Sequence, residues 1–71
     1  MQYDNEIHSI QVKGRTRTFY IDLKKSPNGF FVKMSEKSLK HGRTTIMFDA
    51  EDLEGIIKAL NEVKEKVREV E

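Results

Sequence analysis

Apolar and polar residues alternate through the first two thirds of the chain, and this pattern predicts four β-strands. The alternation is clearest over residues 17–25, where Phe19, Ile21 and Leu23 fall on one side of the strand. Shorter runs predict the other three strands, at about residues 7–13, 30–36 and 43–48. Residues 26–29, Ser-Pro-Asn-Gly, combine turn-forming residues and predict a hairpin. Four strands with no helix between them predict an antiparallel sheet.

The last third of the chain changes to a helical period. Asp49 is a suitable N-cap, and the acidic residues after it favour the positive end of a helix dipole, so we expect a helix over about residues 50–69. Its apolar residues have the 3-4 spacing of a heptad stripe, and Ile57 widens that stripe. The stripe consists of Leu53, Ile56, Leu60, Val63, Val67 and Val70. The predicted architecture is one α+β domain over residues 1–71, with four strands followed by a C-terminal helix.

Strand alternation divides the side chains of the predicted sheet between two faces. The apolar face, which we expect to be the core beneath the helix, carries Ile10, Val12, Phe19, Ile21, Leu23, Phe30, Val32, Met34, Ile46 and Phe48. The polar face carries Ser9, Gln11, Lys13, Tyr20, Asp22, Lys24, Phe31, Lys33, Ser35, Arg43, Thr45 and Met47. The aromatic residues of the polar face lie among lysines and arginines, which is typical of sheets that stack bases and contact phosphates of single-stranded nucleic acid. A solvated face or a protein interface would produce a similar pattern.

Charge is unevenly distributed along the chain, although the net charge is only +1. Residues 1–48 hold nine basic and four acidic residues (+5), and residues 49–71 hold four basic and eight acidic residues (−4). A basic half next to an acidic half favours a localised site for a polyanion. The chain has no cysteine, no apolar run of about 20 residues and no signal-peptide pattern in residues 1–6, so we expect a soluble, cytoplasmic protein.

Residues 19–36 resemble the repeat of the PUR family of purine-rich-element-binding proteins. The matching positions are Phe19, Tyr20, Asp22, Lys24, Gly29, Phe31, Lys33 and Glu36. The pattern departs from the family at Ser26, where the family has Asn, and at Phe30, where it has Arg. The departure at Ser26 is expected to weaken a polar contact of the hairpin, and the departure at Phe30 removes a cation.

The resemblance implies a short single-repeat protein, nucleoid-associated if bacterial, that binds single-stranded DNA or RNA, preferentially purine-rich or G-rich sequences. It implies nucleic-acid contacts by Lys24, Asn28 and Phe31 with Lys33 nearby. The other candidates on the polar face are Tyr20, Gln11, Lys13 and Arg43. Two family repeats intertwine through their helices, so we expect a homodimer. Its predicted interface consists of Leu53, Ile56, Ile57, Leu60, Val63 and Val67.

We do not expect an enzyme. His8 and His41 fall in different predicted elements, and the carboxylates of Asp22 and Glu36 fall among lysines with which they would form surface ion pairs. We expect no cofactor, no metal, no small-molecule substrate and no membrane partner. The alternative function is a protein-interaction or dimerisation module that does not bind nucleic acid.

Overall fold

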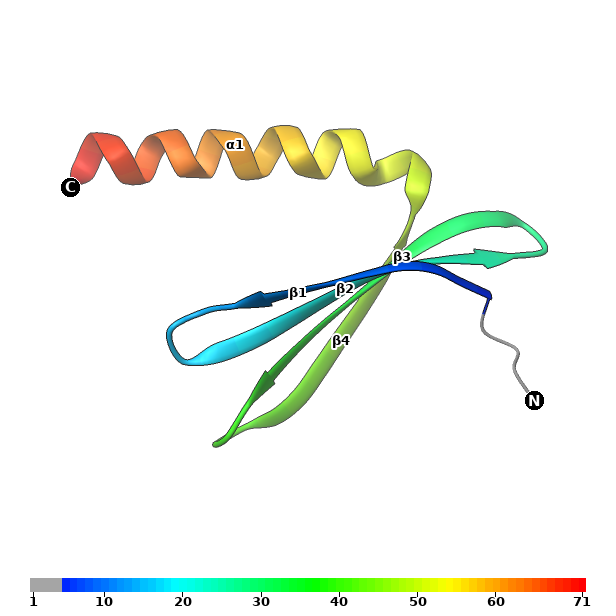
Figure 1. The fold of residues 1–71 in the computed structure, drawn as a ribbon. Helices are drawn as coiled ribbons and strands as arrows, with labels where there is room; N and C mark the ends of the chain where they lie inside the picture. Colours follow the sequence, from blue (N-terminus) through cyan, green and yellow to red (C-terminus); the bar gives the residue numbers. More distant parts are fainter. Residues whose placement is uncertain (1–4) are drawn as a thin grey trace.

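The computed structural model describes residues 5–71 and confirms the predicted α+β architecture (Figure 1). The strands are β1 (Asn5–Lys13), β2 (Arg17–Ser26), β3 (Gly29–Ser38) and β4 (Gly42–Asp49). A short 3₁₀ turn, η1 (Ala50–Asp52), joins the sheet to the helix α1 (Leu53–Val70). Most of the N-terminal segment that we expected not to be a signal peptide lies outside the described residues. No helix in the described part of the chain is long and apolar enough to cross a bilayer.

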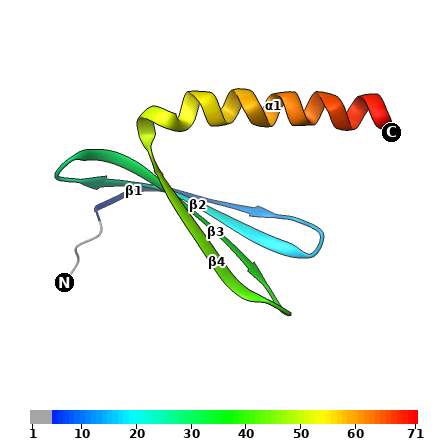
Figure 2. The same cartoon turned by 180° about the vertical axis from the view of Figure 1, so that it is seen from behind.

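The sheet is an antiparallel meander with the order β1-β2-β3-β4. Ile21 of β2 pairs with Ile10 and Met34, and its neighbour Tyr20 pairs with Gln11 and Ser35. This register separates the two faces as the sequence predicts. The β2–β3 hairpin lies at one end of the sheet, the hairpin end, and the β1–β2 and β3–β4 loops lie at the other, the loop end (Figure 2).

The β2–β3 hairpin is stabilised by Ser26 and Gly29. Gly29 has a φ of 129°, a region that favours glycine, and no other residue type in the described chain has a positive φ. The Ser26 hydroxyl accepts a hydrogen bond from the Asn28 N–H and donates one to the Gly29 carbonyl, both at 3.2 Å. Ser26 therefore supplies polar contacts within this hairpin, at the position where the family pattern has Asn.

The helix α1 does not cover the apolar face of its own sheet, and our expectation that it would do so is wrong. The chain leaves the edge strand β4 through η1, and α1 then runs as a separate arm (Figures 1 and 2). Only the first turn approaches the sheet: Leu53 lines a shallow apolar hollow with Ile10, Ile21 and Val32. Asp49 precedes η1 rather than α1 and makes no side-chain capping hydrogen bond, so the regular helix begins later than predicted.

Much of the apolar surface of the chain is therefore exposed. Val32 is the one buried apolar side chain among residues 6–71. Phe30 lies on the apolar face as predicted but is 48% exposed, with the Lys25 Nζ 5.9 Å from its ring centroid. The radius of gyration is 14.3 Å, whereas a compact chain of this length would have about 11 Å. A single copy thus leaves its apolar face and the stripe of α1 without a covering layer.

Candidate nucleic-acid interface

The register places the candidate residues of the polar face in four successive rows. From the hairpin end to the loop end, the rows are Glu6–Lys24–Phe31–Asp49, Ser9–Asp22–Lys33–Met47, Gln11–Tyr20–Ser35–Thr45 and Lys13–Thr18–Lys37–Arg43. Strand parity predicted this face, but the order of its rows depends on the pairing of the strands. Aromatic side chains and cations are distributed along the whole length of the face.

At the hairpin end, Phe31 points to the opposite face of the sheet from Phe30. It lies between Lys24 and Asp49 in neighbouring strands and is partly buried. A shallow hollow beside it is lined by Asn28, Met47 and other residues of the hairpin and β4. The structure therefore brings together Phe31 and Asn28, two of the residues that the resemblance implicates, at an accessible surface.

Lys24 occupies a different environment from the one its predicted role requires. Its residue surface is only 7% exposed, and its Nζ lies 3.9 Å from the Glu6 Oε1. This contact depends on an irregularity in β1, where the register with β2 shifts between Glu6 and His8. No sequence signal marks this shift, so the burial of Lys24 could not be predicted. The ammonium group is engaged inside the protein, which makes Lys24 a weaker candidate for a phosphate contact than Lys33.

The middle of the polar face combines a carboxylate with polar and basic neighbours. Ser9 Oγ donates a hydrogen bond of 2.6 Å to Asp22 Oδ1, and Lys33 pairs with Asp22 across β2 and β3. On the edge strand β1, Gln11 and Lys13 are both exposed. These contacts fix Asp22 in a local polar cluster.

Farther toward the loop end, Tyr20 and Arg43 form a cation–π pair. The guanidinium carbon of Arg43 lies 5.6 Å from the centroid of the Tyr20 ring. Ser35, in the strand between them, is 5% exposed and makes a 3.2 Å hydroxyl–hydroxyl hydrogen bond with Thr45. Both members of the pair were candidates from the sequence, but their contact across β3 was not predicted.

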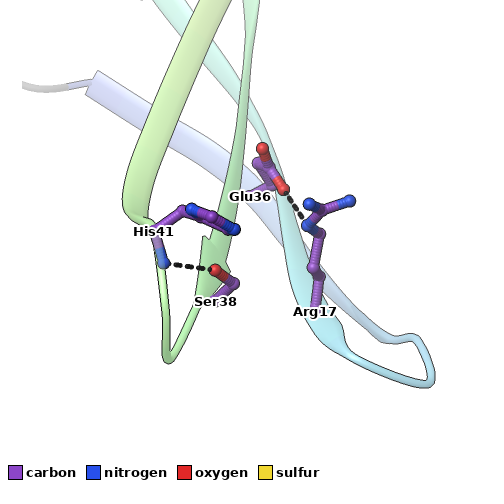
Figure 3. Close-up of polar contacts among 4 residues, drawn as sticks. All are labelled: Arg17, Glu36, Ser38 and His41. Carbon is purple, nitrogen blue, oxygen red and sulfur yellow. Dashed lines mark hydrogen bonds and ion pairs between the residues drawn. The ribbon is translucent and has the colours of Figure 1, made fainter.

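The loop end carries additional basic residues, which Figure 3 shows in part. The Arg17 Nε lies 2.9 Å from the Glu36 Oε1, on the apolar side of the sheet, because Glu36 pairs with Phe19. Asp22 and Glu36 thus belong to opposite faces and do not form a carboxylate pair. Lys37 is exposed beside Arg43 on the polar face and was missed as a candidate, because the predicted third strand ended at residue 36 whereas β3 continues to Ser38.

The two histidines lie in different parts of the fold. His8 pairs with Leu23 on the apolar face, whereas His41 is exposed in the β3–β4 loop and its backbone N–H donates a 2.9 Å hydrogen bond to Ser38 Oγ (Figure 3). No group of three or more His, Asp or Glu side chains in the described residues is arranged to hold a metal ion.

Comparison of the chain with protein-family models, curated proteins and solved structures gave no match. The resemblance to the PUR repeat therefore remains a prediction from the residues quoted above.

Proposed function

We propose that this protein is a non-enzymatic single-stranded nucleic-acid-binding protein of the PUR type that functions as a homodimer in the cytoplasm. The observation that carries the proposal is the polar face, where Phe31, Tyr20 and Arg43 provide planar groups and Lys33 provides charge on one open sheet. Planar side chains stack on any base, and cations pair with phosphates. A preference for purine-rich or G-rich strands follows from the resemblance.

The charge distribution favours the sheet over the helix as the binding surface. The segment from Asp49 to Glu71, which contains α1, carries four basic and eight acidic residues and would be repelled by phosphates. A sheet face has no helix to insert into the major groove of B-form DNA. Single strands, whose bases are free to stack on the sheet, are therefore the expected ligand.

Dimerisation is supported by the surface that one copy leaves uncovered. The chain exposes 6271 Å², whereas a compact monomer of its mass would expose roughly 4,600 Å². The difference, roughly 1,700 Å² per copy, is in the range that obligate dimers bury. The apolar face and the stripe of α1 contain most of the exposed large apolar side chains, and a second copy of the chain, which carries both surfaces, would cover them.

The uncovered stripe of α1 also favours the second candidate function, an interaction module that does not bind nucleic acid. Salt dependence separates the two functions. Binding through phosphates weakens steeply as salt rises, whereas binding through apolar surface does not.

The proposed function is tested by fluorescence polarisation with matched single-stranded and double-stranded oligonucleotides of DNA and RNA at two salt concentrations. We expect tighter binding to single strands and a loss of affinity at the higher salt concentration. Purine-rich and pyrimidine-rich strands of equal length test the base preference. Equal or tighter binding to the duplex would indicate that the polar face binds nucleic acid through charge alone. Failure to bind any strand would favour the interaction module.

A further inference from the structure

Tyr20 and Arg43 form a cation–π pair on the polar face, away from the hairpin end. We propose that this pair is a second base-stacking subsite, separate from Phe31, so that the protein binds one strand at two points. The inference rests on the proposed function. It identifies the part of the polar face that makes affinity depend on the length of the strand.

The pair is built across three strands. Tyr20 lies on β2 and Arg43 on β4, in neighbouring rows of the polar face, so their contact crosses β3, where Tyr20 pairs with Ser35 and Arg43 pairs with Lys37. Ser35, which pairs with Tyr20, is small and 5% exposed, so its side chain does not obstruct a contact across β3. Arg43 is exposed and Tyr20 is partly buried, so the guanidinium is the more accessible member of the pair. A base can stack on the exposed guanidinium, because guanidinium groups stack on bases as aromatic rings do.

The charges around the pair favour a phosphate backbone next to the stacked base. Lys37 pairs directly with Arg43, and Lys13 belongs to the same row, separated from Lys37 by Thr18. This row contains no acidic residue. Glu36, the acidic residue next to Lys37 in sequence, belongs to the other face and pairs with Arg17. A strand whose base rests on Arg43 would therefore meet two further cations.

The distance between the two stacking points sets a minimum length for the ligand. Tyr20 lies four residues along β2 from Lys24, the partner of Phe31, which corresponds to about 13 Å. A stacked strand advances about 3.4 Å per nucleotide, so about four nucleotide steps separate the two subsites. A trinucleotide can occupy one subsite at a time, whereas a strand of six or more nucleotides can occupy both. When one strand makes both contacts, the second contact forms within the complex, at a high effective concentration, and the affinity rises.

The test compares affinity for single strands of three, six and ten nucleotides in the wild type and in Arg43→Lys, Tyr20→Leu and Phe31→Ala. We expect the wild type to gain affinity steeply between three and six nucleotides. Each variant is expected to lose this gain, with a roughly 5-fold to 150-fold lower affinity for the ten-nucleotide strand. Arg43→Lys retains the charge, so the salt slope should be unchanged. Tyr20→Phe retains the ring and should restore the length dependence that Tyr20→Leu loses. Lys58→Ala, on α1 and outside the polar face, is the control, with wild-type affinity at every length.

Circular dichroism and thermal melting of each variant separate a loss of stacking from a loss of folding. If Arg43→Lys keeps the length dependence of the wild type, or if Tyr20→Leu lowers the melting temperature without changing affinity per folded molecule, the pair is structural and the second subsite is refuted. In that case the proposed function stands as long as Phe31→Ala weakens binding. If the wild type binds no strand at any length, the proposed function and the second subsite both fail.

Discussion

The exposed stripe of α1 gives the most direct test of the proposed dimer, through the substitution Leu60→Ala. Leu60 lies near the middle of the stripe and is 58% exposed in a single copy. If Leu60 packed only within its own chain, its truncation would have little effect on association. A helix that packs against a second copy would lose buried surface in both subunits.

The expected magnitude follows from this exposure. Complete burial of a leucine side chain stabilises by about 1.5–3 kcal/mol, so the part of Leu60 still exposed corresponds to about 1–2 kcal/mol per copy. Two copies lose about 2–4 kcal/mol of association free energy. Since each 1.4 kcal/mol is a factor of ten, the dissociation constant of the dimer should rise by about 30-fold to 700-fold.

Sedimentation equilibrium over a concentration series measures this change. The wild type should have twice the chain mass of 8.3 kDa at micromolar concentration, and Leu60→Ala should dissociate at much higher concentrations than the wild type. Lys58→Ala, on the same helix but outside the stripe, is the matched control and should leave the dissociation constant unchanged. A wild type that is a folded monomer at micromolar concentration would refute the reasoning, as would a Leu60→Ala protein that dimerises as tightly as the wild type.

Further predictions concern the polar face and the hairpin. Phe31→Ala should weaken the binding of single strands by about 1–3 kcal/mol with little change in its salt dependence, whereas Lys33→Ala should reduce the slope of that dependence by about one counterion. Fluorescence titrations at several salt concentrations test both effects. Identical behaviour of the two variants would contradict the assignment of stacking to Phe31 and of a phosphate contact to Lys33. Ser26→Ala removes two hairpin hydrogen bonds and should destabilise the fold by about 1 kcal/mol in urea denaturation, so unchanged stability would show that these bonds contribute nothing net. Gly29→Ala should cost about 1–3 kcal/mol through its φ of 129° alone, because a Cβ there would meet no atom within 4 Å. A thermal melt equal to that of the wild type would exclude backbone strain.

The sequence predicted the strands, their faces and the existence of the helix, because each depends on a local period. Phe30 and Phe31 were assigned to opposite faces by parity, and the strand register confirms the assignment. The position of α1 could not be predicted in the same way. An apolar stripe indicates that a helix packs against another apolar surface. The pattern is identical whether that surface belongs to its own sheet or to another copy of the chain.

The details of the candidate site also depend on pairings that a single-strand pattern does not contain. Lys24 was predicted to contact nucleic acid, yet the shifted register of β1 places Glu6 near its ammonium group. The contact between Tyr20 and Arg43 spans three strands and becomes visible only when β2, β3 and β4 are aligned. Composition and parity thus identify which residues share a face, while the register decides which of them touch.

The meander order of the strands has a consequence for the local unfolding and refolding of the chain. Each strand pairs with its neighbour in sequence, so the sheet forms through short loops with a small closure entropy. The helix closes no long loop and is joined to the sheet only through η1, and an amphipathic helix gains most of its stability from the packing of its apolar face. In one copy, the amides of the sheet and those of α1 therefore belong to separate opening units in hydrogen exchange. Protection of the helix amides should depend on protein concentration, while protection in the central strands β2 and β3 should depend on it much less.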